Sequence, residues 1–262
     1  MTDVSVAYEG SAAAWEAGPA RLYDRLAERI IASAGGDLEG MLVLDVGAGT
    51  GALCRAVRAR NGTPVALDPS ADMLAHAGDA ALISVTGDML ALPFIDNSFD
   101  AAVSAFAVSH VEAPVRALAE MGRVVRGGAR VVVGVFGATP PNPSKDVVDD
   151  VAARFGYLPP AWYARLKAYL EPLSNTPELL SACAHAGGLH DVRIEDVVVD
   201  SGLNSAEAIV GYRLGMAHLA PFVRSLSSQR REDLLAQAVS EVRERGQAVR
   251  PRVLILSCRA AA

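Results

Sequence analysis

An acidic residue followed by three glycines is the pattern in this chain that points most directly to chemistry. Apolar residues from Met41 lead to Asp45, and Gly47, Gly49 and Gly51 follow. Such a run is typical of a parallel strand whose end meets a ligand, because glycines let the backbone turn sharply and approach the ligand without a Cβ in between. A helix starting there would point its free N–H groups at the same place. The loop therefore predicts a site for a small, polar, nucleotide-like ligand.

The spacing alone leaves more than one ligand class open. Gly47, Gly49 and Ala52 also fit G-x-G-x-x-A, the relaxed dinucleotide fingerprint, which would make the chain an NAD-linked oxidoreductase. Asp45 argues against that interpretation, because its carboxylate would repel a pyrophosphate. It suits a ligand that carries an ammonium or sulfonium group. A tight strand-to-helix turn without any ligand is the third interpretation, and the density of glycines disfavours it.

A second acid follows the next predicted strand. Asp68 comes roughly twenty residues after the glycine loop, where an acid can bind both hydroxyls of a ribose. The alternative is an acid placed at a helix N-terminus and favoured there by the helix dipole. The chain also has a Gly-Asp pair at Asp88, which is either a third ligand-binding acid or a simple turn.

These motifs belong to an ordered series that resembles the class I S-adenosylmethionine-dependent methyltransferases, in their small-molecule branch. The resemblance runs over residues 42–136. Its blocks are LDVGAGTG from residue 44, VALDPSADML from 65, GDMLALPF from 87, NSFD from 97, AFAVSHV from 105 and RVVRGG from 123. One such block would be weak evidence, but all of them in order and at similar spacing are strong evidence.

The resemblance implies S-adenosyl-L-methionine as cofactor and S-adenosyl-L-homocysteine as product. It implies that Asp45 holds the methionine ammonium, directly or through water, and that Gly47 and Gly49 let the backbone reach the methionine part. Asp68 would bind the ribose, with Pro69 directly after it in the same cofactor-binding block.

The remaining cofactor contacts implied by the resemblance come from later blocks. Met73 would pack on the adenine or ribose, or be ordinary core. Asp88 would accept from the adenine amino group, and Met89 would add a backbone N–H. Ala105 would offer backbone to the methionine end, with Phe106 as an apolar wall beside it.

Two further residues are candidates for the reacting end of the site. Relatives fold an N-terminal segment over the cofactor, and among Tyr8, Trp15 and Tyr23 we favour Tyr8 as the residue that closes it. His110 is placed like a general base that removes a proton from a phenol, enol or amine. The alternative is a histidine that only packs the cap.

The elements that must position these residues alternate between strand and helix. The patterns predict strands over 41–46, 64–67, 82–85, 101–106 and 130–136, and helices over 19–34, 51–60, 70–77 and 114–125. Ser70 is expected to cap its helix, and the glycine pair at 127–128 is expected to end the last one. Since right-handed crossovers bring the C-terminal ends of parallel strands to one rim, the glycine loop, Asp68, Asp88 and Ala105 should converge.

The alternation breaks after residue 137. Three prolines predict a stiff linker, followed by helices over 145–156, 160–170 and 177–186, a strand over 192–199, helices over 205–214 and 229–245, and a last strand over 253–258. We therefore expect an α/β, Rossmann-like, doubly wound and mostly parallel seven-stranded sheet with helices on both faces. Residues 1–137 would form an N-terminal helical segment plus the cofactor-binding core. Residues 138–262 would form the final strands and a helical cap, from insertions after strand 5 and before the last strand.

The apolar residues in these insertions would line an acceptor pocket or only pack the cap: Trp162, Tyr163, Tyr169, Tyr212, Met216 and Phe222. Ser104-Ala105-Phe106-Ala107 stands where nucleic-acid amino-methyltransferases carry an aspartate-proline-proline motif. This favours O-, C- or N-methylation of a small-molecule acceptor, and bacterial specialised metabolism is the setting we expect. Non-methylating chemistry on the same fold, such as cyclisation, stays open as an alternative.

Composition narrows the classes of partner. The 262 residues carry a net charge of −6, which argues against nucleic acid as a partner. Three distant cysteines without CxxC spacing argue against a metal site or disulfides. With no leader pattern and no apolar run of ~20 residues, we expect a cytoplasmic protein without membrane contact; a homodimer is left open.

Overall fold

The computed structural model describes residues 7–35, 37–139 and 142–262. Its centre is a seven-stranded sheet in the order β3-β2-β1-β4-β5-β7-β6. The strands are β1 Leu42–Val46, β2 Thr63–Asp68, β3 Ile83–Thr86, β4 Phe99–Ala105, β5 Val125–Phe136, β6 His190–Val198 and β7 Arg252–Arg259. β7 runs antiparallel to both β5 and β6, and the pairs from β3 to β5 are parallel. The expected mostly parallel sheet is confirmed.

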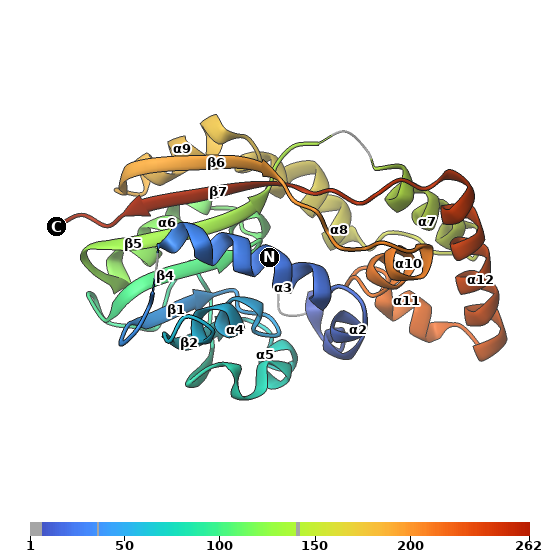
Figure 1. Cartoon of the computed structure of the whole chain (residues 1–262), viewed down its shortest axis with the longest axis horizontal. Coiled ribbons are helices and arrows are strands. Elements are labelled where there is room, and N and C mark those ends of the chain that lie inside the picture. The colour runs from blue at the N-terminus through green and yellow to red at the C-terminus, as the bar shows by residue number, and fades with distance from the viewer. Residues whose placement is uncertain (1–6, 36, 140–141) are drawn as a thin grey trace.

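Helices cover both faces of the sheet because its central strands are apolar on both sides (Figure 1). Along β1, Val43 packs in one hydrophobic cluster with α3 (Ala20–Ala34) and Leu44 in another with α6 (Pro114–Val124). α4 (Ala52–Arg58) joins the first face and α9 (Pro177–Ala186) the second. This layering leaves the ends of the strands as the place where polar ligands can enter.

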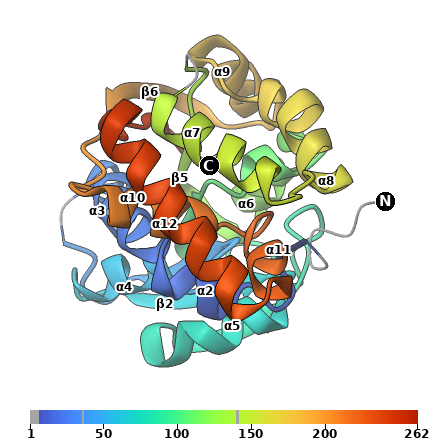
Figure 2. The same ribbon diagram turned by 90° about the vertical axis from the view of Figure 1, so that its right-hand side faces the viewer.

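A further group of helices gathers beyond the C-terminal ends of the parallel strands, toward the right of Figure 1 and facing the viewer in Figure 2. α12 packs against α7 and α10. We call this group the cap; it consists of α7 (Pro143–Arg154), α8 (Ala161–Arg165), a π-helical turn η3 (Leu166–Leu170), a 3-10 turn η4 (Glu171–Leu173), α10 (Ala206–Leu214), α11 (Ala220–Ser225) and α12 (Ser228–Arg245). The cap comes from the two insertions that the sequence indicated.

Several predicted boundaries need correction. The helix expected over 160–170 is α-helical only to Arg165 and continues as η3. The glycine pair at 127–128 does not end a helix: α6 ends at Val124 and both glycines lie inside β5. The short helices α2 (Ala12–Ala17) and α11 were not predicted. Most of the proline linker lies outside the described residues.

Candidate active site

A single cavity of about 1250 Å³ lies between the ends of the strands and the cap. Every predicted site residue lines it, although they come from five different segments of the chain. The lining includes Tyr8, Asp45, Gly47, Gly49, Asp68, Pro69, Met73, Asp88, Met89, Ala105, Phe106 and His110. The structure thus brings these residues together, and the role of each one stays a prediction.

The glycine loop forms one wall of the cavity, and its conformation requires glycine. Gly47, Gly49 and Gly51 all have positive φ, at +76°, +55° and +84°. A Cβ on Gly47 would lie 2.2 Å from the Cβ of Ala107, so any side chain there would collide with the loop after β4. The N–H groups of Gly47 and Ala48 both donate to the Leu67 carbonyl, at 2.7 and 3.0 Å. The loop is therefore fixed against β2 before any ligand arrives.

Asp45 lies at the end of β1 beneath this loop and is fully buried. Its Oδ2 accepts from the Cys54 thiol at 3.1 Å, whereas its Oδ1 has no hydrogen-bond partner among the described residues. Burial raises the pKa of Asp45 to about 7. A buried carboxylate oxygen without a donor is costly, and a cationic ligand group in the cavity would compensate for it.

Asp68 ends β2, and two nearby backbone N–H groups donate hydrogen bonds to its carboxylate. Oδ2 accepts from the Gly49 N–H at 2.9 Å and Oδ1 from the Ser70 N–H at 2.8 Å. Ser70 caps α5 (Ala71–Ala77) through Met73, as expected. Burial raises the pKa of Asp68. Asp68 thus ties the glycine loop to the start of α5 while still facing the cavity.

Asp88 and Met89 follow β3 at the open side of the cavity. Asp88 is exposed, and its Oδ1 accepts from the Leu90 N–H at 2.8 Å, which is the geometry of an Asp turn. Met89 is buried, and so is Met73, which packs with Trp15. The turn interpretation of Asp88 and its ligand-binding interpretation are compatible, because the turn uses Oδ1 and no hydrogen bond to the described residues occupies Oδ2.

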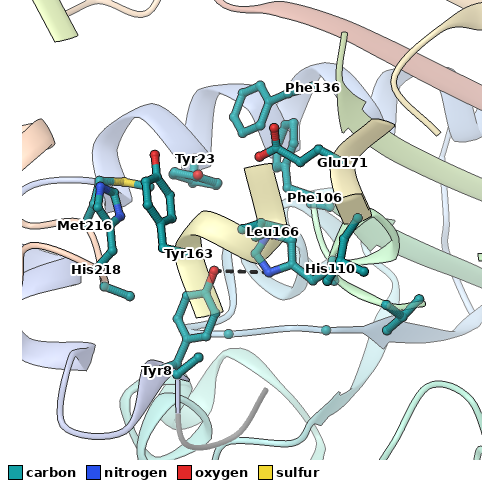
Figure 3. A pocket seen from close by; sticks show the side chains of 18 of the residues that line it. Tyr8, Tyr23, Phe106, His110, Phe136, Tyr163, Leu166, Glu171, Met216 and His218 are labelled. Atoms are coloured by element: carbon teal, nitrogen blue, oxygen red, sulfur yellow. Dashed lines mark hydrogen bonds between the residues drawn. The ribbon is translucent and has the colours of Figure 1, made fainter. Parts of the chain in front are cut away.

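Aromatic rings form the wall at the reacting end (Figure 3). Phe106 follows β4 with a φ of +62°, and its N–H donates to the Gly134 carbonyl at 2.7 Å. Its ring stacks on Phe136 with centroids 4.2 Å apart, and Tyr23 meets it edge-on at 5.4 Å. A non-glycine residue at positive φ is strained and persists where its surroundings fix it. Here the Gly134 hydrogen bond and the two ring contacts hold Phe106 in this conformation.

Tyr8 and His110 face each other across the cavity. The Tyr8 hydroxyl lies 3.3 Å from His110 Nδ1, as the dashed line in Figure 3 shows, and the two rings stack with centroids 5.9 Å apart. Burial, with repulsion from Lys167, lowers the pKa of His110 to about 4. His110 is therefore neutral at pH 7 and able to accept a proton. Tyr8 also contacts Trp162 of the cap, so it bridges the N-terminal segment and the cap.

The cap contributes residues that the sequence suggested and others that it did not. Trp162, Tyr163, Tyr212 and Met216 line the cavity, whereas Tyr169 is 70% exposed and Phe222 only packs against the core. The cap residues that sequence analysis missed are charged or polar: Lys145, Asp149, Arg213, His218 and Glu171. One signal was available, because Lys145 and Lys167 are the only two lysines in the sequence and both line the cavity.

Several polar residues have structural roles away from the cavity. Asp100 accepts from the Leu42 N–H at 2.8 Å, and Asp96 pairs with Arg123, so the Asp96–Asp100 region acts in turns and strand starts as expected. The three cysteines are buried and unpaired. Among the described residues there is no cluster of metal-ligating side chains and no helix long and apolar enough to cross a membrane.

Comparison with known proteins decides between the ligand classes that the glycine loop left open. Residues 44–133 match the family described as methyltransferase domain. This segment of the chain is therefore similar to methyltransferase domains. The match covers the glycine loop, Asp68, Asp88 and His110, and it ends before the cap. It sets aside the NAD-linked alternative for this domain.

The relatives of this methyltransferase domain match part of the chain. Demethylmenaquinone methyltransferase of Renibacterium salmoninarum is 38% identical over 128 residues, which are 48% of this chain and 54% of that protein. The chain spans about half the length of the curated relatives it matches.

Two solved structures share the fold. Haemonchus contortus phosphoethanolamine N-methyltransferase 2, in complex with S-adenosyl-L-methionine, has a TM-score of 0.58 at 17% identity and covers 90% of this chain and 52% of its own. The [4+2]-cyclase SpnF has a TM-score of 0.57 at 21% identity and covers 91% and 82%.

Proposed function

We propose that the protein is an S-adenosylmethionine-dependent methyltransferase that acts on a small-molecule acceptor. The observation that carries the proposal is the buried Asp45 Oδ1, which lacks a donor directly beneath the glycine loop of a methyltransferase domain. An ammonium group is the ligand chemistry that this carboxylate lacks.

The residues present fit the cofactor. Gly47 and Gly49 present backbone to the cavity with no Cβ in the way, Asp68 offers carboxylate oxygens at the distance along the chain typical of ribose binding, and Met73 supplies an apolar surface. Asp45 would hold the ammonium. Asp88 and Met89 would contact the adenine, and Ala105 and Phe106 the methionine end. When bound, S-adenosylmethionine supplies a methyl group already activated on a sulfonium.

The protein's own contribution is alignment, exclusion of water and removal of a proton. The Phe106, Phe136 and Tyr23 rings give the acceptor an apolar wall beside the methionine end. Neutral His110 would take the acceptor's proton, with Tyr8 holding the orientation of its ring. The Tyr8 segment and the cap enclose the reacting groups.

The acceptor class is suggested by the aromatic wall, which fits a planar ring. The curated relatives are named demethylmenaquinone methyltransferase, and transfer to a ring carbon or oxygen would agree with them. Because the family match ends before the cap, the cap's own residues must decide the acceptor of this chain.

Calorimetric titration with S-adenosylmethionine, S-adenosylhomocysteine and NAD tests the proposal. We expect micromolar binding of both sulfur ligands and no binding of NAD. Asp68→Ala should abolish binding, whereas Asp100→Asn, which removes a structural carboxylate outside the cavity, should keep it. Binding of NAD, or no binding of either sulfur ligand, would overturn the assignment.

Product analysis then separates methyl transfer from other chemistry on the fold. A methyltransferase adds one methyl group to the acceptor and forms one S-adenosylhomocysteine for each product molecule. Turnover of an acceptor without formation of S-adenosylhomocysteine would instead indicate cyclisation or another non-methylating reaction.

A further inference from the structure

The cap places a group of polar side chains in the same cavity as the glycine loop, and the cofactor contacts proposed above do not use them. Lys145 lies on α7, Tyr163 on α8 and His218 between α10 and α11. We call these three residues the cap subsite. All of them lie outside the segment that matches the methyltransferase family.

Lys145 supplies the charge of the cap subsite. Among the described residues no acid forms an ion pair with it, and its ammonium lies over the Tyr212 ring, whose centroid is 6.0 Å from Nζ. The other lysine, Lys167, is paired with Glu171. Burial lowers the pKa of Lys145, and repulsion from Arg213 and Lys167 lowers it further. A partly buried cation without a paired acid is stabilised by an anion.

His218 supplies a hydrogen-bonding atom that nothing in the described chain satisfies. Only 4% of its surface is exposed, and its buried Nε2 has no partner. Its ring stacks flat on Tyr163 with centroids 3.6 Å apart. Burial, together with Arg213, Lys167 and Lys145, lowers its pKa to about 2, so it is uncharged. Its Nε2 is therefore free to bond a ligand group in the cavity.

Arg213 fixes the subsite without competing for the ligand. Its guanidinium binds Asp149 through two bonds of 2.8 and 2.6 Å, which neutralises it. It also donates to the Tyr163 hydroxyl at 3.2 Å. Because that hydroxyl accepts from Arg213, its own hydrogen is left to donate into the cavity. Arg213 and Asp149 are thus positioning residues for Tyr163.

The cavity has room for a second ligand. Its volume of about 1250 Å³ exceeds the ~300–1,000 Å³ that a single drug-sized ligand occupies. The aromatic wall of Phe106, Phe136 and Tyr23 and the three residues of the cap subsite line the same cavity. In Figure 3 the Phe106 and Phe136 rings lie apart from the Tyr163–His218 pair, with Tyr23 drawn between them.

We infer that the cap subsite binds the carboxylate of a planar aromatic acceptor whose ring lies against the aromatic wall. Lys145 would pair with the carboxylate, and Tyr163 and His218 would donate hydrogen bonds to its oxygens. One unpaired ammonium balances one negative charge, which favours a carboxylate over a phosphate dianion. The inference rests on the proposed function, since it names the acceptor class for that site.

The test uses a matched pair of probes, 2-naphthoate and 2-naphthamide, which share their size and differ in charge. Each is titrated by calorimetry into the full protein saturated with S-adenosylhomocysteine. We expect the acid to bind about tenfold more tightly than the amide, because a charge-assisted hydrogen bond replaces a neutral one. Lys145→Gln should remove this preference. Lys167→Gln is the control, because it removes a lysine already neutralised by Glu171, and it should keep the preference.

A second readout does not depend on a variant. With only two lysines, selective ¹³C labelling gives two lysine side-chain signals, and Lys167→Gln assigns them by elimination. The Lys145 signal should shift with 2-naphthoate and not with 2-naphthamide.

Equal affinity for both probes, a preference that survives in Lys145→Gln, an unmoved Lys145 signal, or no binding of either probe would each overturn the inference. If the wild-type protein did not bind S-adenosylhomocysteine, the proposed function itself would be overturned. Failure of the inference and failure of the proposed function are therefore distinguishable.

Discussion

Replacing Asp45 by asparagine should change how stability depends on pH. The folded protein raises the pKa of this fully buried carboxylate from 3.8 to about 7. A shift of that size costs about 4 kcal/mol of folding free energy once the group is ionised, at 1.36 kcal/mol per pKa unit. The folded state holds the Asp45 proton more tightly than the unfolded state does. The contribution of protonated Asp45 to stability is therefore fully present below pH 3.8, is lost as the pH rises toward 7, and does not change above that.

The Asp45→Asn variant would lack this dependence. Its amide keeps an acceptor for the Cys54 thiol but adds donors without partners, which costs roughly 1–3 kcal/mol at every pH. The informative quantity is therefore the difference in unfolding free energy between Asp45→Asn and wild type, measured in urea at pH 5 and pH 8. From pH 5 to pH 8, the unfolding free energy of the variant should rise by roughly 2–3 kcal/mol relative to that of wild type.

The matched control is Asp150→Asn, which changes an exposed acid on α7 in the same way. Its difference from wild type should be the same at both pH values. If the difference in unfolding free energy between Asp45→Asn and wild type were also the same at pH 5 and pH 8, the folded protein would not destabilise the Asp45 carboxylate. The reasoning that this carboxylate needs a cationic ligand would then be refuted.

Three further predictions follow from the same geometry. Gly47→Ala should lower the affinity for S-adenosylhomocysteine more than tenfold in calorimetry, because its Cβ would collide with the loop after β4; Gly40→Ala, also at positive φ but with nothing within 4 Å, should retain it, and equal effects would contradict the account. Asp149→Asn should lower the urea unfolding free energy by about 3 kcal/mol, since it leaves Arg213 buried without its counter-charge, and an unchanged value would argue against that pair. A transfer rate that depends on neutral His110 as base should stay constant from pH 8 to about 5 and fall only near pH 4, because only there does solvent protonate the ring and remove the base; a midpoint near 6.5 in the rate profile would show that His110 is not in its buried, neutral state.

The cofactor half of the site could be predicted because its chemistry is local. The glycines, Asp68 and Asp88 each stand at the end of a strand, and the parallel order of β3-β2-β1-β4 brings strand ends to one rim. The backbone conformation of this rim depends on residues near in sequence, such as Gly47 at positive φ and Ser70 as a cap. Periodicity and motif spacing report such features directly.

The acceptor half could not be predicted, because its residues meet only through packing of the cap. Lys145, Tyr163 and His218 lie on segments whose order in space depends on how α7, α10 and α12 pack together. Arg213 resembles any helical arginine until its contact with Asp149 is known. The glycine pair at 127–128 misled for a related reason, since β5 pairs with β4 at Val125, before the glycines, and again from Arg130, after them.

A crystal structure of the protein with S-adenosylhomocysteine would test the central claim most directly. We expect the ligand's ammonium at Asp45, its ribose hydroxyls at Asp68, its adenine between Asp88 and Met89, and its sulfur directed at the space between Phe106 and His110. A ligand bound in the reverse orientation, or one held in the cap at Lys145 with Asp45 still unpartnered, would contradict it.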